Sequence, residues 1–320
     1  ALACGRCNPY GSLANCHPHP LLVVINYLLL SISTVVFLIV GKKLLDTKED
    51  RYLLWFLVVW MFFWSQHSNL TWGFQSAFFL AYLLPLASII FFWQSHQSKE
   101  SESLYFILSL LTGVASIGSM ANGLFALPLV FLYSLILKDS WRRSLVLFVI
   151  SILCIWLYFN DYQAPSHHAS LITSIKTDFL GVIRFTARYI GSPFANLLNS
   201  NYLKLFSEVL GFFVLFFIGY QLIANFFKQK TDSLNFALLV FTIYVIFTAF
   251  VTGGGRLSLG LDAAFESRYT TPAIMLFSVV YLILAQLLKS KRKFMVFVLG
   301  IIVLCMLPEQ LKAIKNKSTA

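Results

Sequence analysis

The sequence predicts an all-α protein, a polytopic transmembrane helical bundle of about ten spans, and three observations support this. Apolar residues make up 58% of the 320 residues and charged residues only 12%, whereas soluble domains have about 45–50% and about 25%. The mean hydropathy is +0.78. Nearly unbroken apolar stretches recur along the chain, and a spanning helix needs roughly 20 apolar residues. The chain therefore has room for many spans and little room for a soluble domain.

Ten apolar stretches are separated by short polar loops. They cover residues 20–40, 52–64, 74–93, 103–118, 121–137, 143–159, 205–227, 234–252, 271–288 and 293–308. The shorter ones must include flanking Trp, Ser or Asn residues or lie in a locally thinned bilayer. We expect one transmembrane domain over residues 20–310. An irregular external segment, 1–19, precedes it, and a short basic tail, 311–320, follows it.

Lysine and arginine gather in every second loop, which orients the bundle. Loops 65–73 and 118–121 contain neither residue. Fourteen lie in the alternate short loops, near residues 42–51, 99, 138–143, 228–230 and 289–293. The positive-inside rule places this basic set in the cytoplasm. The tail, with Lys312 and Lys315, breaks the pattern, so either it lies outside or the last stretch does not cross.

The net charge of +11 would suggest a nucleic-acid partner in a soluble protein. Here the cations flank apolar stretches, where they orient helices and meet anionic head groups. We therefore expect membrane lipids and no nucleic acid as partners.

The long connection 160–204 carries apolar residues at near-helical spacing, with cations between them. These residues are Leu171, Ile172, Ile175, Phe179, Leu180, Ile183 and Ile190, and the cations are Lys176, Arg184 and Arg188. The pattern predicts an amphipathic helix that lies in the membrane interface on the outer side.

Two clusters of metal-ligand residue types have simpler interpretations. Cys4-x-x-Cys7 with Cys16, His17 and His19 could coordinate zinc, but its spacing is irregular and no second Cys-x-x-Cys follows. His167 and His168 are adjacent on a loop, where solvated side chains are the more common outcome. We predict no metal site from either cluster.

Two outer loops are polar in a way that favours ligand binding. The first contains Gln66, Asn69, Trp72 and Gln75. Amides beside indoles can bind a sugar through hydrogen bonds and ring stacking, while an interfacial aromatic belt is the alternative. A smaller turn that contains Asn122 follows a stretch of small residues, which favours close helix packing.

The second loop contains the run Gly253–Arg256, followed by Glu266, Arg268 and Tyr269. A glycine run lets backbone approach a ligand, and two arginines can grip phosphate oxygens. Local pairing of Glu266 with Arg268, or anchoring to head groups, are the alternatives.

These loops carry a resemblance to a known family. Gln66-x-x-Asn69-x-x-Trp72-Gly-Phe-Gln75, the Ser119–Gly123 turn, and Gly255-Arg256 with Ser267-Arg268-Tyr269-Thr270 resemble a group of bacterial multispanning membrane proteins. That group is similar in layout to GT-C-type glycosyltransferases. The resemblance covers roughly residues 20–310, and it implies a multi-pass protein of the bacterial inner (plasma) membrane.

The resemblance implies an enzyme that transfers a sugar from a polyprenyl-phosphate donor to an envelope glycan or lipid acceptor at the outer face. Arg268, with Arg256, would hold the lipid phosphate and stabilise charge on the leaving group. Gln66, Asn69, Trp72, Gln75, Asn122 and Tyr269 would complete the substrate site. An acid in the first external loop would act as general base or bind a divalent metal.

This sequence departs from that pattern because no Asp or Glu occurs between residues 1 and 45. We therefore assign no catalytic residue, and we expect the chain to be the later part of a longer protein, inactive as it stands. The alternatives are a non-catalytic transporter or flippase for a lipid-linked glycan, or a structural membrane protein. Transporters favour ionisable groups in mid-span, and the apolar stretches here are almost free of charge.

Overall fold

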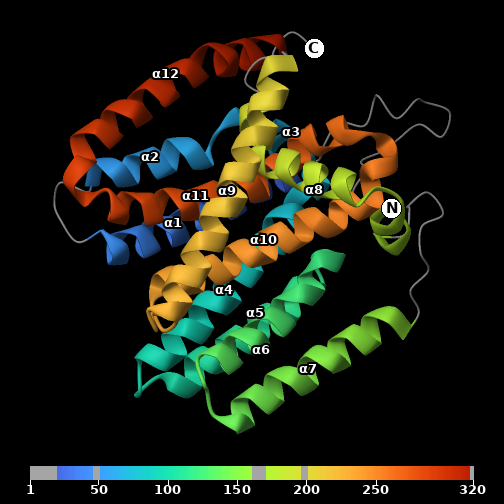
Figure 1. The fold of residues 1–320 in the computed structure, drawn as a ribbon, viewed down its shortest axis with the longest axis vertical. Coiled ribbons are helices and arrows are strands. Elements are labelled where there is room, and N and C mark those ends of the chain that lie inside the picture. Colours follow the sequence, from blue (N-terminus) through green and yellow to red (C-terminus); the bar gives the residue numbers. More distant parts are fainter. Residues whose placement is uncertain (1–19, 46–50, 161–170, 196–200, 318–320) are drawn as a thin grey trace.

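Every element in the described part of the chain is a helix, so the predicted all-α class is confirmed (Figure 1). The computed structural model describes residues 20–45, 51–160, 171–195 and 201–317. The predicted external segment 1–19, with its cysteines and histidines, lies outside these residues, as do Asp161, His167 and His168.

Twelve α-helices are described. They are α1 (Pro20–Leu44), α2 (Arg51–Met61), α3 (His67–Thr71), α4 (Ser76–Gln97), α5 (Glu102–Ile117), α6 (Ala126–Ile136), α7 (Trp141–Asn160), α8 (Leu171–Ala195), α9 (Asn201–Phe227), α10 (Leu234–Arg256), α11 (Thr270–Leu287) and α12 (Arg292–Lys317). Short 3₁₀ helices join them: η3 (Trp64–Gln66), η4 (Gly73–Gln75), η5 (Ala121–Phe125), η6 (Leu257–Leu259), η7 (Leu261–Phe265), η8 (Ser267–Tyr269) and η9 (Lys289–Lys291). Each of the ten predicted stretches overlaps one of these helices.

Six helical segments are long and apolar enough to cross a membrane, which gives the chain the make-up of an integral membrane protein. They are Pro20–Leu44, Gly73–Gln97, Trp141–Asn160, Asn201–Phe227, Leu234–Leu259 and Ser267–Leu287. The predicted number of about ten spans is not confirmed. Helices α2, α5 and α6 have only 11, 16 and 11 residues, whereas a crossing takes roughly 20.

The loops rich in lysine and arginine gather at one end of the bundle, here called the basic end (Figure 1). It comprises the last turn of α1 and the turns at 98–101, 137–140, 228–233 and 288–291. Hydrogen bonds join these turns, since the Lys43 ammonium donates to Gln94 Oε1 at 3.2 Å and the Trp93 indole donates to the Asp232 carbonyl at 2.7 Å. The segments 62–75, 118–125 and 257–269 lie at the opposite end.

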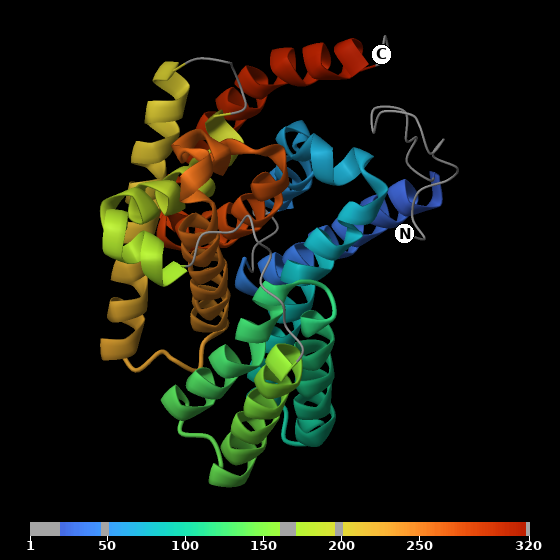
Figure 2. The ribbon, with the colours of Figure 1, turned by 90° about the vertical axis from the view of Figure 1, so that its right-hand side faces the viewer.

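The centre of the molecule is formed by α4, α10 and α11. In the most apolar 18 residues of each helix, the buried share is 78% for α11 and 67% for α10, but only 17% for α7. Helices α5 and α6 pack on α4, and α7 packs on α6. Figure 2 shows these helices as one group, and Figure 1 shows α7 at its outer edge. The helix α12 packs on α2 and η3 and continues to Lys317, so the predicted boundary at residue 310 falls inside a helix.

The predicted amphipathic helix is present as α8, but its environment changes along its length. Asp178 has non-helical backbone angles, and its carboxylate accepts a hydrogen bond from the Gly181 N–H at 2.8 Å, as an N-cap does. Before this point Ile172 is 66% exposed. Beyond it Ile190 is fully buried against the protein. The apolar side chains of α8 are therefore exposed near its start and buried near its end, and its place in the membrane interface stays a prediction.

The second part of α8 packs closely on α9 because small residues face each other. A Cβ atom added at Gly191 would lie 1.9 Å from the Ser207 carbonyl oxygen, and one at Gly211 would lie 1.9 Å from that of Ala187. Ala187-x-x-x-Gly191 and Ser207-x-x-x-Gly211 are both pairs of small residues at the spacing that lets membrane helices approach. This signal is present in the sequence and indicates a packed helix pair.

Candidate functional site

The two polar loops predicted to form a site meet at the opposite end of the bundle. The Ser267 hydroxyl donates to the Ser65 carbonyl at 2.7 Å and accepts from the Ser68 N–H at 3.1 Å. The Asn69 amide donates to the Arg268 carbonyl at 2.8 Å. Residues about 200 positions apart in sequence are thus joined directly.

The amides Gln66 and Asn69 lie inside this junction and are fully buried. Asn69 Nδ2 donates to the Thr271 hydroxyl at 2.7 Å, and that hydroxyl donates to Gln66 Oε1 at 2.7 Å. Both residues were predicted to bind substrate. In the structure they link the first loop to the start of α11, and they fix the backbone that carries Arg268.

A buried asparagine in α1, Asn26, completes the junction and was missed in the sequence analysis. Its Nδ2 donates to the carbonyls of Asn69 and Trp72, both at 2.9 Å. An amide in the middle of an apolar stretch is a signal in itself, because an unpaired polar group in lipid costs several kcal/mol. Such residues are expected to face the bundle interior and to find a partner.

The glycine run belongs to the last turn of α10 rather than to a ligand-binding loop, which corrects the expectation for Gly253–Arg256. Gly253 and Gly254 are buried, and the Gly254 carbonyl accepts a hydrogen bond from the Ser174 hydroxyl of α8 at 2.6 Å. A Cβ at Gly254 would lie 2.0 Å from Leu171 Cδ1. These glycines make room for α8.

Arg256 and Arg268 both lie against the ring of Tyr269. Their guanidinium carbons are 6.0 Å and 5.5 Å from the ring centroid, within reach of a cation–π interaction. Arg268 also pairs with Glu266, as the alternative of local pairing predicted. Among the described residues, Arg256 has no carboxylate partner.

The ring of Tyr269 is held from inside by Tyr189 of α8. The two rings stack with centroids 4.9 Å apart, and Tyr269 is 4% exposed. The Tyr189 hydroxyl shares a hydrogen bond of 2.9 Å with Tyr82 of α4. The Tyr269 ring that contacts the two arginines therefore packs against the core of the bundle.

A network of charges between α8, α9 and η7 borders this site. Glu208 is 5% exposed and accepts from Arg184 Nε at 2.6 Å and from Arg188 Nε at 2.7 Å. Arg188 also bonds to Asp262 at 2.7 Å, and Lys204 bonds to the same carboxylate at 2.7 Å. Sequence analysis identified Arg184 and Arg188 as cations of the predicted helix, but it could not pair them with acids on other elements.

The network keeps Asp262 ionised. The hydrogen bond from Lys204 and the positive charges of Lys204 and Arg188 lower the pKa of the Asp262 carboxyl, against a smaller effect of burial. The neighbouring Glu208 raises the pKa of Arg184 through hydrogen bonding and charge. Neither group is set up to release or accept a proton near neutral pH.

The remaining predicted residues are dispersed around the opposite end. Trp72 is 55% exposed and contacts Phe74. Gln75 is 4% exposed. Asn122 lies in η5, which packs on α4, α5, α6 and α7, a different part of this end. The structure therefore gathers Gln66, Asn69, Arg256, Arg268 and Tyr269, but not all eight residues.

Several buried acceptors at this end have no hydrogen-bond donor within the described residues. They include the side-chain oxygens of Asn26, Asn69 and Gln75. Buried polar atoms in proteins are nearly always hydrogen-bonded, so these amide oxygens are suited to a donor from outside the described residues, such as water.

Over the part of the chain that the structure describes, no three His, Cys, Asp or Glu side chains come together as a metal site would require. Compared with known proteins, the chain matches no protein-family model, no curated protein and no solved structure. The resemblance to GT-C-type glycosyltransferases therefore stays a prediction.

Proposed function

We propose that this chain is a membrane-embedded, glycosyltransferase-like protein of the bacterial inner membrane. It binds a polyprenyl-phosphate-linked sugar at the opposite end of the bundle, which faces away from the cytoplasm. The observation that carries this proposal is the pair Arg256 and Arg268 on the anchored ring of Tyr269, where two loops distant in sequence meet.

The charges of this pair favour a phosphate ligand. Arg256 has no carboxylate partner in the described chain, so its guanidinium is free to bind an anion. Arginine binds phosphate oxygens in a bidentate manner. Both residues lie at ends of spanning segments, Leu234–Leu259 and Ser267–Leu287, where the head group of a lipid-linked substrate would be.

A side chain of the first loop favours a sugar on that phosphate. The exposed ring of Trp72, in the loop that Asn69 joins to Arg268, supplies a surface for stacking. In a transfer reaction the two arginines would stabilise the phosphate as it leaves. We assign no general base, because Asp262 and Glu266 are both held in ion pairs.

The proposed topology has ten crossings. The successive helices α1, α2, α4, α5, α6, α7, α9, α10, α11 and α12 connect the two ends in alternation (Figure 1). Lysine and arginine in the turns of the basic end place that end in the cytoplasm. The short helices α2 and α6 would cross with the help of flanking polar residues in a thinned bilayer.

The alternative is a non-catalytic transporter or flippase for the same ligand. The buried Glu208 near the start of the apolar helix α9 is the observation in its favour, since ionisable groups in membrane helices often mark transport routes. Both functions need the phosphate site, and only a transferase forms a glycosylated product.

The test is binding and turnover of a radiolabelled polyprenyl-phosphate sugar by the purified protein. We expect Arg256→Gln and Arg268→Gln to weaken binding about 10- to 100-fold each, because each removes a hydrogen bond to a charged group. Lys99→Gln at the basic end is the control and should bind normally. Unchanged binding in both arginine variants would refute the proposal, whereas binding without product would favour the transporter.

A further inference from the structure

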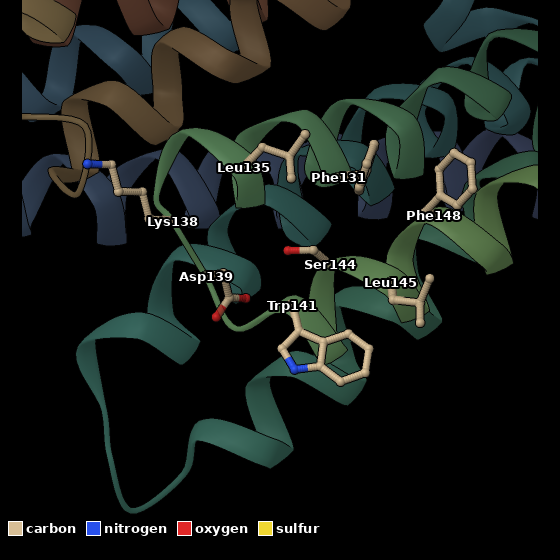
Figure 3. A pocket seen from close by; sticks show the side chains of 8 residues that line it. All are labelled: Phe131, Leu135, Lys138, Asp139, Trp141, Ser144, Leu145 and Phe148. Atoms are coloured by element: carbon tan, nitrogen blue, oxygen red, sulfur yellow. The ribbon is translucent and has the colours of Figure 1, made fainter.

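A shallow hollow lies between α6 and α7 at the basic end, far from the site described above. Its volume is about 470 Å³, within the usual size of ligand pockets. Phe131 and Leu135 of α6 and Leu145 and Phe148 of α7 form its walls (Figure 3). An apolar hollow on a lipid-facing surface fits a hydrocarbon chain.

The turn at the mouth of the hollow contains an unusual residue. Lys138 has φ of 54°, in the left-handed region that normally favours glycine at the end of a helix. The Lys138 N–H donates to the Leu135 carbonyl at 3.1 Å and the Asp139 N–H donates to the Ser134 carbonyl at 3.0 Å. This is a Schellman motif with lysine in the glycine position, and strained positions of this kind cluster at functional sites.

Ion pairs at the mouth involve Asp139, Arg143 and Glu102. Asp139 lies within 3.4 Å of Arg143 Nε and 3.6 Å of His96 Nε2. Burial raises the pKa of its carboxyl, but the nearby His96, the hydrogen bond from the Ser140 N–H and the charge of Arg143 lower it overall. Arg143 also bonds to Glu102 at 2.7 Å. The acids of the turn are thus occupied.

Lys138 and Arg142 remain without a carboxylate partner among the described residues. Figure 3 shows the Lys138 side chain extending outward from the turn, with Trp141 on the other side of Asp139. The Arg142 guanidinium carbon lies 5.9 Å from the centre of the Trp141 ring. Lys138 therefore lines the hollow directly, and Arg142 lies against Trp141, which also lines it.

We propose that this hollow binds an acidic phospholipid in the leaflet at the basic end, with its phosphate between Lys138 and Arg142 and one acyl chain along Phe131, Leu135 and Phe148. Basic pockets between membrane helices on the cytoplasmic side are the usual sites for acidic lipids. The inference is independent of the proposed transferase function, because it involves other helices and the other end of the molecule.

The test is native mass spectrometry of the purified protein titrated with phosphatidylglycerol or phosphatidylcholine. Each cation near the surface contributes about 1 kcal/mol to the attraction of an anionic lipid, or about fivefold in affinity. We expect one phosphatidylglycerol to bind about 25-fold more tightly than phosphatidylcholine. Lys138→Gly and Arg142→Gln should each lose about fivefold of this preference.

Gln229→Gly is the matched control for Lys138→Gly. Gln229 has φ of 51° in the same type of turn at the same end, so its replacement gives the same backbone relief without removing a cation. The control should keep the full lipid preference. Because glycine suits both turns, loss of binding in Lys138→Gly would not come from misfolding.

A second pair of variants tests the apolar part of the site. Leu135→Trp would fill the hollow and should reduce phosphatidylglycerol binding, whereas Leu157→Trp, at an exposed position of α7 outside the hollow, should not. Soluble glycerol phosphate should not displace the lipid. Equal binding of the two lipids, an unchanged preference in Lys138→Gly, or displacement by glycerol phosphate would each overturn the proposal.

Discussion

Polar side chains differ in burial and pairing between the two ends of the bundle. At the opposite end, Gln66 and Asn69 are fully buried and bonded to residues about 200 positions away. At the basic end, Lys99, Lys138 and Arg142 have no carboxylate partner in the described residues, and Lys99 and Arg142 are exposed. The charge of a loop therefore predicts which end it joins, but its polarity does not predict that its side chains are accessible.

This comparison changes the interpretation of the amide loop. A sequence rich in Gln, Asn and Trp favours ligand binding. Here the Asn69 amide nitrogen holds two loops together, and the Gln66 amide nitrogen bonds to the nearby Met61 carbonyl. What remains for a ligand is the outer surface of the junction, which includes Arg256, the exposed part of Arg268 and Trp72. The opposite end thus has a buried junction between distant loops, whereas the basic end has short turns linked by exposed contacts.

The largest loss of stability at the opposite end is expected from substitution of Glu208. Glu208→Gln would leave Arg184 and Arg188 beside a neutral amide, and loss of one partner from a buried ion pair destabilises by about 3–5 kcal/mol. We expect about 3 kcal/mol, because Arg184 is 41% exposed and Arg188 retains Asp262. Thermal unfolding in detergent measures this. A change below 0.5 kcal/mol, on the order of a surface substitution, would show that the network does not hold α8 to α9.

The next effect concerns the junction between the loops. Asn69→Ala removes the donor to the Arg268 carbonyl and the Thr271 hydroxyl, which leaves buried acceptors unpaired, and we expect a loss of about 2 kcal/mol. A double-mutant cycle with Thr271→Val should give a coupling of about 1 kcal/mol. Strict additivity of the two substitutions would argue against the junction.

At the basic end, glycine substitutions at two strained positions should stabilise the protein. Lys138→Gly and Gln229→Gly each place glycine at a left-handed position, and we expect each to raise the free energy of unfolding by about 1 kcal/mol. Thermal unfolding in lipid-free detergent isolates this effect from lipid binding. Destabilisation by both variants would mean that the side chains contribute more than the strained backbone costs.

The smallest effect is the contribution of Asp262 to the pH dependence of stability. Its pKa is lowered in the folded protein, so the stability it contributes is present above its unfolded value, about 3.9, and is lost as the pH falls through the lower folded value. The carboxyl is 61% exposed, so the contribution is below about 1 kcal/mol. Asp262→Asn should therefore unfold with a shallower pH dependence below pH 4, measured by tryptophan fluorescence. An unchanged profile would remove Asp262 from the network.

Much of the fold could be predicted because hydropathy is a local property. All ten apolar stretches overlap helices, and the alternation of basic loops matches the two ends seen in Figure 1. The ends of helices were less accurate: α2 stops at Met61 and α4 continues to Gln97. The glycine run after residue 252, predicted to approach a ligand, is instead the last turn of α10, because Gly253 and Gly254 leave room for α8.

The site could be predicted only in part. Sequence identified Arg256, Arg268 and Tyr269, which lie together, because arginines and aromatic residues between apolar stretches are conspicuous. It could not show that Asn69 is buried or that Arg188 joins Glu208 to Asp262, since those contacts depend on how distant helices are arranged. Asn26 and the small-residue pairs of α8 and α9 were visible signals that went unused.

The account depends above all on the two ends facing different compartments. Single cysteines at Ser258 and Lys99, both exposed and one at each end, can be introduced into a chain whose own cysteines are replaced by alanine. We predict that a membrane-impermeant maleimide added to intact cells labels Ser258→Cys and spares Lys99→Cys until the cells are opened. Labelling of Lys99→Cys in intact cells, with Ser258→Cys protected, would contradict the proposed orientation and with it the external phosphate site.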